Sequence, residues 1–206
     1  MARRKLSVVN ISVPFLFPVC KVHNKYALAT LTIENRFEMN PIVSIIMGST
    51  SDLPVMEKAC QFFEEMEIPF EVNALSAHRT PQEVSEFARN AQGRGIRVVI
   101  AGAGMAAALP GVIAAETPLP VIGVPIKGSC LEGLDATFAI MQMPPGIPVA
   151  TVAINGAQNA AILAMQILAL SDERLMKQLV AYKAGLKKKI VKANEELAKL
   201  EYKFKV

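Results

Sequence analysis

Cysteine and histidine are scarce in this chain of 206 residues, and tryptophan is absent. The three cysteines form an odd set without a Cys-x-x-Cys spacing, so the sequence predicts neither a disulfide framework nor a zinc cluster. Only two histidines are present, His23 and His78, which argues against a histidine-based metal site. We therefore expect no bound metal and a reducing, cytoplasmic environment.

Long apolar runs and an excess of charge are missing as well. No uninterrupted apolar stretch reaches the roughly 18 residues of a membrane-spanning helix. Residues 1–38 hold six of the 22 basic and two of the 18 acidic residues, so the whole net charge of +4 lies there. The balanced remainder predicts no nucleic-acid surface. A hydrophobic content of 52% excludes a disordered chain and suffices for a substantial core.

The N-terminal segment 1–38 differs from the rest. Basic residues at 3–5 precede an apolar stretch, as in an export signal, but Pro14 and Pro18 interrupt that stretch and no clear cleavage site follows. We expect a disordered extension or an over-extended start, since Met39 opens directly onto a strand-like run. We expect residues 39–206 to form a single α/β domain that carries the catalytic site.

From residue 42 onward, short apolar runs alternate with helical patterns. We expect strands at 42–47, 70–75, 97–101, 119–124 and 149–154, with helices between them and two more at 156–170 and 172–204. Strands that are apolar throughout and alternate with helices predict a parallel sheet covered on both faces. Five such units fit a doubly wound, flavodoxin-like α/β/α domain, in which ligands bind at the carboxyl ends of the strands.

The two C-terminal helices predict an assembly. Only three amide side chains interrupt the apolar surface over 156–170, so this helix must be buried nearly all round, in the core or against another subunit. The basic helix over 172–204 carries apolar positions of its own. Because an isolated chain would expose a large apolar patch, we expect a closed homo-oligomer.

The loop after the first expected strand, residues 48–52, suits a phosphate and a ribose. Its small residues let backbone N–H groups approach an anion, and the hydroxyls of Ser49 and Ser51 can donate to phosphate oxygens. Asp52 suits a ribose diol. The loop is neither GxGxxG nor GxxxxGK[ST], so it predicts no dinucleotide or nucleoside triphosphate. An ordinary capped helix start explains it about equally well.

The loop after the second expected strand, residues 76–81, contains His78, which is the sole histidine of the domain. An imidazole carries a proton either way near neutral pH, and the adjacent Arg79 offers a fork of donors for phosphate or carboxylate. Thr80, followed by proline and then Glu83, predicts a capping box at the start of the next helix. The position of His78 and Arg79 among the loops that are expected to bind a ligand favours a catalytic role over an incidental pair on the surface.

Two further features are ambiguous. The segment 101–111 is rich in glycine and alanine, which allows either a close approach of backbone to ligand or tight helix–sheet packing. Cys130, in a Gly-Ser loop, is an alternative nucleophile, although no base lies beside it in the sequence. Cys60 lies in an amphipathic helix and is interpreted as a core residue.

These motifs together resemble a known family. Gly48-Ser49-Thr50-Ser51-Asp52, Ser76-Ala77-His78-Arg79-Thr80-Pro81, Ala101-Gly102-Ala103-Gly104 with Leu109-Pro110-Gly111, and Gln142-Met143-Pro144 with Gly146-Ile147-Pro148-Val149 resemble those of the class I N5-carboxyaminoimidazole ribonucleotide mutases of bacterial purine biosynthesis. The resemblance extends from residue 42 to the C-terminal helix.

The resemblance implies a carboxyl transfer from N5 to C4 of an aminoimidazole ribonucleotide, without metal, nucleotide or biotin cofactor. It implies that Ser49 and Asp52 bind the substrate, that Ser76 and Arg79 bind its phosphate, and that His78 is the acid/base. Ser51 and Gly104 complete the expected substrate-binding set. The family forms homo-octamers in which the C-terminal helix reaches a neighbouring subunit.

The chain departs from the family at two positions, where Met105 replaces a glycine and Ala108 replaces a histidine. Two other functions remain open. One is a phosphoribosylaminoimidazole carboxylase that uses free CO2, although Arg79 and the Leu109-Pro110-Gly111 turn favour the mutase. The other is a ribonucleotide-binding module without catalysis.

Overall fold

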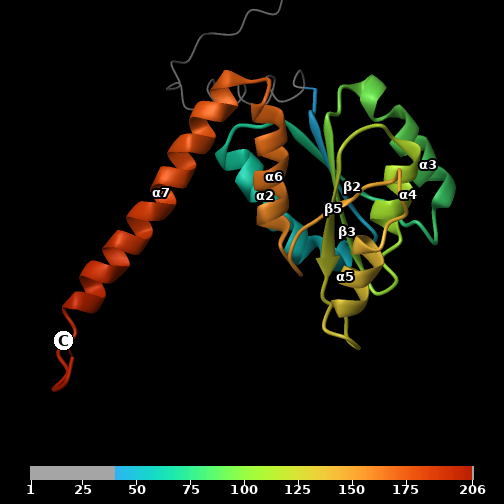
Figure 1. The fold of residues 1–206 in the computed structure, drawn as a ribbon. Coiled ribbons are helices and arrows are strands. Elements are labelled where there is room, and N and C mark those ends of the chain that lie inside the picture. Colours follow the sequence, from blue (N-terminus) through green and yellow to red (C-terminus); the bar gives the residue numbers. More distant parts are fainter. Residues whose placement is uncertain (1–39, 206) are drawn as a thin grey trace, which may run out of the picture. The chain divides into compact units, whose positions relative to one another are not determined.

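The computed structural model describes residues 40–205, and the extension expected over residues 1–38 lies outside this range. The described chain forms a parallel sheet between layers of helices (Figure 1). The strands are β1 (Val43–Met47), β2 (Phe70–Ala74), β3 (Val98–Gly104), β4 (Val121–Ile126) and β5 (Ala150–Thr151). The helices are α2 (Leu53–Glu65), α3 (Pro81–Asn90), α4 (Leu109–Glu116), α5 (Leu134–Met141), α6 (Ala157–Ala169) and α7 (Glu173–Ala198), with 3-10 turns η1 (Thr50–Asp52) and η2 (Gln92–Arg94).

The order of the strands in the sheet is β2-β1-β3-β4-β5, all parallel, which confirms the doubly wound, flavodoxin-like prediction. The last residue of β1, Met47, is in register with Ala74 of β2 and Gly102 of β3, and Gly104 is in register with Ile126. The carboxyl ends of these four strands therefore meet at one edge of the sheet, and the loops that follow them lie side by side.

Alternate residues of each strand enter two separate cores, because successive side chains point to opposite faces of a sheet. Val43 and Ile45 pack with α2 and α6 on one face, and α7 packs on α6. Ile46 and Val99 pack with α3, α4 and α5 on the other face. This arrangement confirms the three-layer architecture (Figure 1).

The glycine-rich segment after residue 100 is strand rather than loop. The expected third strand ends at residue 101, but β3 continues to Gly104 because hydrogen bonding to both β1 and β4 overrides the low strand propensity of glycine. A Cβ on Gly102 would lie 2.6 Å from the Met56 sulfur of α2, so this glycine serves helix–sheet packing. The other boundaries also differ from expectation: β4 begins two residues later, β5 spans only Ala150–Thr151, and α7 ends at Ala198.

The capping box expected at Thr80 is wrong. The Thr80 hydroxyl turns back into the preceding loop, where it donates to the Ser76 carbonyl at 3.1 Å and accepts from the Ser76 N–H at 2.9 Å. The hydroxyl therefore braces the loop that carries His78 and Arg79 and makes no capping bond to the helix.

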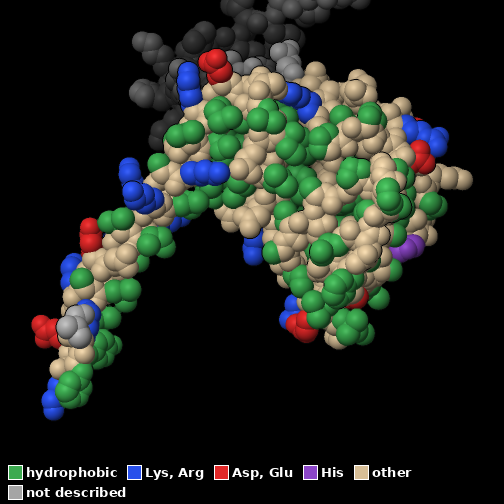
Figure 2. Space-filling view, in the orientation of Figure 1, with side chains coloured by type: hydrophobic (Ala, Val, Ile, Leu, Met, Phe, Trp, Pro, Cys, Tyr) green, Lys and Arg blue, Asp and Glu red, His purple; other side chains and the backbone are tan. Residues whose placement is uncertain are grey.

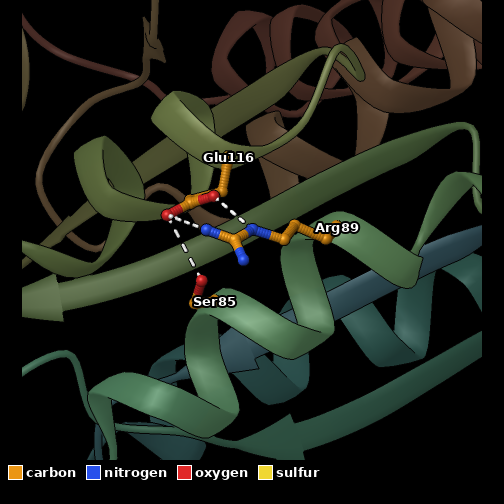
Figure 3. A network of polar contacts seen from close by, with 3 residues as sticks. All are labelled: Ser85, Arg89 and Glu116. Atoms are coloured by element: carbon orange, nitrogen blue, oxygen red, sulfur yellow. Dashed lines mark hydrogen bonds and ion pairs between the residues drawn. The ribbon is translucent and has the colours of Figure 1, made fainter.

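A polar network ties α3 to α4 (Figure 3). Arg89 donates to both carboxylate oxygens of Glu116, with Nε–Oε2 at 2.7 Å and Nη2–Oε1 at 3.3 Å, and the Ser85 hydroxyl donates to Oε1 at 3.2 Å. The hydrogen bonds from Arg89 hold the pKa of Glu116 below its ordinary value. Arg89 and Glu116 lie in the last turns of α3 and α4, so this network fixes the spacing of the two helices at their C-terminal ends.

The helix α7 exposes large apolar side chains, whereas α6 is mostly buried (Figure 2). Seven residues of α6 are buried, and Leu175 and Leu179 join α7 to the same core. Beyond that contact, α7 exposes a stripe of large apolar side chains, namely Met176, Val180, Leu186, Ile190, Val191 and Leu197. Within residues 40–205, no helix has both the length and the apolar character needed to cross a membrane.

Candidate active site

The loops after β1, β2, β3 and β4 surround a cavity of about 580 Å³. This volume is in the range of small-molecule sites, roughly 300–1,000 Å³. All seven residues expected at the site line the cavity: Ser49, Ser51, Asp52, Ser76, His78, Arg79 and Gly104. Segments 55 residues apart in the sequence meet here because the strands that precede them end at the same edge.

Arg79 spans the first two loops. Its Nη2 donates to the Gly48 carbonyl at 2.9 Å, and its Nε donates to the Ser76 hydroxyl at 3.3 Å. The Ser76 hydroxyl also accepts from the Arg79 backbone N–H at 3.3 Å. The guanidinium is thus held beside the β1 loop with donor capacity to spare, as a phosphate site requires.

The β1 loop is folded around Ser49, whose hydroxyl accepts from the Ser51 N–H at 3.3 Å. Asp52 is half-buried at the end of this loop. Burial raises the pKa of its carboxyl above the ordinary 3.8, while hydrogen bonds from Ser49 and Ser51 and the charge of Arg79 act in the opposite direction. A carboxylate that has lost part of its hydration is a good acceptor for hydroxyl groups such as those of a ribose.

His78 lies in the β2–α3 loop, exposed at the wall of the cavity. The loop holding it is fixed by the bonds of Thr80 and Arg79 to Ser76. An accessible imidazole in a preformed cavity can transfer protons to and from a bound ligand.

The wall formed by residues 105–108 is strained. Met105 and Ala107 have φ angles of 56° and 41°, a left-handed conformation that favours glycine. The side chain of Met105 is 69% exposed and lines the cavity near Gly128, where an added Cβ would lie 3.7 Å from the Met105 Cγ. Met105 therefore narrows the cavity between the β3 and β4 loops. Ala108, also in the lining, leaves this wall apolar.

Sequence reasoning missed Lys127, which lines the cavity directly after β4. A charged residue immediately after a buried apolar strand was the available signal. The backbone N–H of Lys127 donates to the Asn155 Oδ1 at 2.9 Å, and its ammonium group forms an ion pair with Glu132.

The two cysteines within residues 40–205, Cys60 and Cys130, are not among the residues that line the cavity. Cys60 is half-buried and packs against the core, as expected, and its thiol approaches the Met56 carbonyl at 3.6 Å. Cys130 is exposed and is not among the residues that line the cavity. The part of the chain that the structure describes contains no group of three or more His, Cys, Asp or Glu residues that could hold a metal ion.

Comparison with known proteins places this site in context. The model of a family described as AIR carboxylase matches residues 42–189. An N5-carboxyaminoimidazole ribonucleotide mutase of Thermotoga maritima is 52% identical over 79% of this chain and 95% of its own length. A protein of the same name from Pyrococcus abyssi is 55% identical over 72% of this chain and 85% of its own length.

Two other similarities are informative. A phosphoribosylaminoimidazole carboxylase of Candida glabrata is also 52% identical, over 78% of this chain but only 28% of the fungal protein. The crystal structure of Treponema denticola PurE superposes with a TM-score of 0.70 at 28% identity, covering 76% of this chain and 98% of that one.

Proposed function

Because this chain belongs to the AIR carboxylase family, we propose that it is an N5-carboxyaminoimidazole ribonucleotide mutase. The enzyme is an isomerase of purine biosynthesis that moves a carboxyl group from N5 to C4 of the imidazole ring. The observation that carries the proposal is the meeting of the phosphate, ribose and acid/base candidates around one cavity at the carboxyl edge of the sheet.

Phosphate and ribose are bound at the β1 and β2 loops. Arg79, Ser49 and Ser76 hold the phosphate, because their donors converge where these two loops touch. Ser51 adds a hydroxyl, and Asp52 accepts from the ribose. Gly104, at the end of β3, provides a wall of backbone atoms beside the imidazole ring of the substrate.

His78 moves the proton that the rearrangement requires. Protonation of N5 by the imidazolium breaks the N–CO2 bond and leaves CO2 in the cavity. The C4 carbon then attacks CO2, and the C4 proton returns to the neutral imidazole, so no net proton is consumed. CO2 that is held in the cavity meets C4 at high effective concentration. Apolar Met105 and Ala108 suit such a wall.

The same proposal includes the setting of the enzyme. We place it in the cytoplasm as a homo-octamer without nucleic-acid or membrane partners, and with no cofactor. The exposed apolar stripe of α7 supports an assembly in which this helix packs on a neighbouring subunit.

A carboxylase that takes free CO2 is the second candidate, favoured by the equal 52% identity to the fungal protein. The chain spans nearly the whole length of the mutases but about a quarter of the fungal enzymes, which favours the mutase. A ribonucleotide-binding module without turnover is the third.

One experiment separates these candidates. The purified protein is given either the N5-carbamate substrate or aminoimidazole ribonucleotide with bicarbonate, and formation of the C4-carboxylated product is followed by NMR. A mutase converts the carbamate directly. When the carboxyl carbon of the carbamate is labelled, the product therefore retains the label even in the presence of unlabelled bicarbonate. Turnover of aminoimidazole ribonucleotide with bicarbonate, but not of the carbamate, indicates the carboxylase. Binding without turnover of either substrate indicates the binding module.

A further inference from the structure

Two basic side chains, Arg79 and Lys127, are among the described residues that line the cavity. A ribonucleotide that carries a migrating carboxyl group presents two anionic groups, a phosphate and a carboxylate. Each needs a charge-assisted donor, because an unpaired anion in a partly closed site is unfavourable.

The two cations lie at opposite ends of the cavity. Arg79 comes from the loop after β2, but its guanidinium reaches Gly48 after β1, whereas Lys127 follows β4. The order β2-β1-β3-β4 separates β1 from β4 by two strand spacings, roughly 10 Å. Arg79 is held at the phosphate end by its bonds to Gly48 and Ser76. The cation left for the other end of the nucleotide is Lys127.

The backbone of Lys127 is held in place by hydrogen bonds, whereas its side chain can change its ion-pair partner. Its N–H is bound by the Asn155 side chain, and the Asn155 N–H is bound in turn by the Pro125 carbonyl at 2.8 Å. Its ammonium pairs with Glu132, but the two side chains are 54% and 67% exposed. Since an exposed ion pair contributes little, the ammonium can leave Glu132 for a ligand carboxylate at small cost.

We propose that Lys127 binds the migrating carboxyl group of the substrate and product, with Glu132 as its partner in the empty site. This assignment rests on the proposed mutase function. The ammonium orients the carboxylate before the N5–carbon bond breaks and after the C4–carbon bond forms, while Met105 on the facing loop closes the wall around the CO2 between these states.

The test compares the affinities of two nucleotides that differ only in the carboxylate: 4-carboxy-5-aminoimidazole ribonucleotide and 5-aminoimidazole ribonucleotide. Calorimetry on the full-length protein should show that Lys127→Met weakens binding of the carboxylated nucleotide about 10- to 100-fold and changes binding of the other less than about threefold. Lys127→Arg should retain most of the discrimination. Arg79→Ala should weaken the binding of both nucleotides to the same extent.

Glu132→Gln is the matched control, because it frees the ammonium without removing it. This variant should bind the carboxylated nucleotide at least as tightly as the wild type. An equal effect of Lys127→Met on both nucleotides, or no effect on either, overturns the assignment and leaves the mutase function intact. If the wild-type protein binds neither nucleotide, both the assignment of Lys127 and the proposed mutase function are wrong.

Discussion

His78 is the residue on which the chemistry depends, because it is the one histidine among the described residues that line the cavity. Replacement by asparagine retains much of the size of the side chain but removes proton transfer. We expect His78→Asn to lower turnover by ~10²–10⁴-fold while nucleotide binding persists, since the phosphate and ribose contacts come from other residues. Steady-state kinetics and calorimetry on the same preparation measure both.

Cys130→Ala is the control for this experiment. As an exposed residue outside the cavity lining, Cys130 should be replaceable without loss of turnover. If Cys130→Ala abolishes turnover, or if His78→Asn keeps more than about a tenth of it, the acid/base assignment is wrong.

Met105 is a residue whose backbone conformation disfavours its own side chain. At a φ of 56°, a side chain with a Cβ is strained, and the strain outweighs the greater chain entropy of glycine. Met105→Gly should therefore raise the free energy of unfolding by ~0.5–1 kcal/mol in urea denaturation.

The neighbouring Ala106→Gly is the matched control, because Ala106 is not among the residues with positive φ. It should lower the free energy of unfolding. If the two substitutions change the free energy of unfolding equally, the backbone at Met105 is not strained by its positive φ angle. A Met105→Gly enzyme that releases more CO2 to solvent would add support for the role of this side chain as a wall.

At the scale of elements, a second polar network joins two strands to η2. Arg94 makes two 2.8 Å bonds to the carboxylate of Glu71 on β2, and the buried Ser44 hydroxyl of β1 donates to the same group at 2.9 Å. The hydrogen bonds from Arg94, assisted by that from Ser44, lower the pKa of Glu71 below its ordinary 4.5. The ionised carboxylate therefore stabilises the folded state.

The sign of the pKa shift sets the pH dependence. Because the folded pKa is depressed, the stabilisation is present above about 4.5 and is lost as the pH falls through the lower folded value. Glu71→Gln should lower the free energy of unfolding by about 1 kcal/mol at neutral pH. The difference from the wild type should shrink in acid.

Melting temperatures of the two proteins, recorded from neutral pH down to about pH 3, measure this convergence. Glu65→Gln is the control at an exposed position of α2, and it should change stability little at any pH. A constant difference between wild type and Glu71→Gln would contradict the role of the ionised carboxylate.

At the scale of the whole molecule, the apolar stripe on α7 predicts that chains associate. Val180 and Ile190 are 63% and 64% exposed in the single chain, so replacing either with glutamate should leave the fold intact and weaken the assembly. Light scattering at micromolar concentration should show an oligomer for the wild type and smaller species for Val180→Glu and Ile190→Glu.

Lys188→Glu tests whether charge alone has this effect, since Lys188 is exposed on the same helix without being part of the apolar stripe. It should leave the assembly unchanged. A wild-type monomer, or identical assembly in all three variants, would show that the stripe is not an interface.

The sequence by itself determined the alternation of strands and helices and the parallel three-layer fold, because hydrophobic period is a local property. The full set of seven candidate site residues followed from the family resemblance. Only the tertiary structure decided the extent of β3, since pairing with β1 and β4 compensates for its glycines. It also decided that the Thr80 hydroxyl braces Ser76 and that Lys127 lines the cavity. These outcomes depend on which distant segments become neighbours, and that follows from the order of the strands in the sheet.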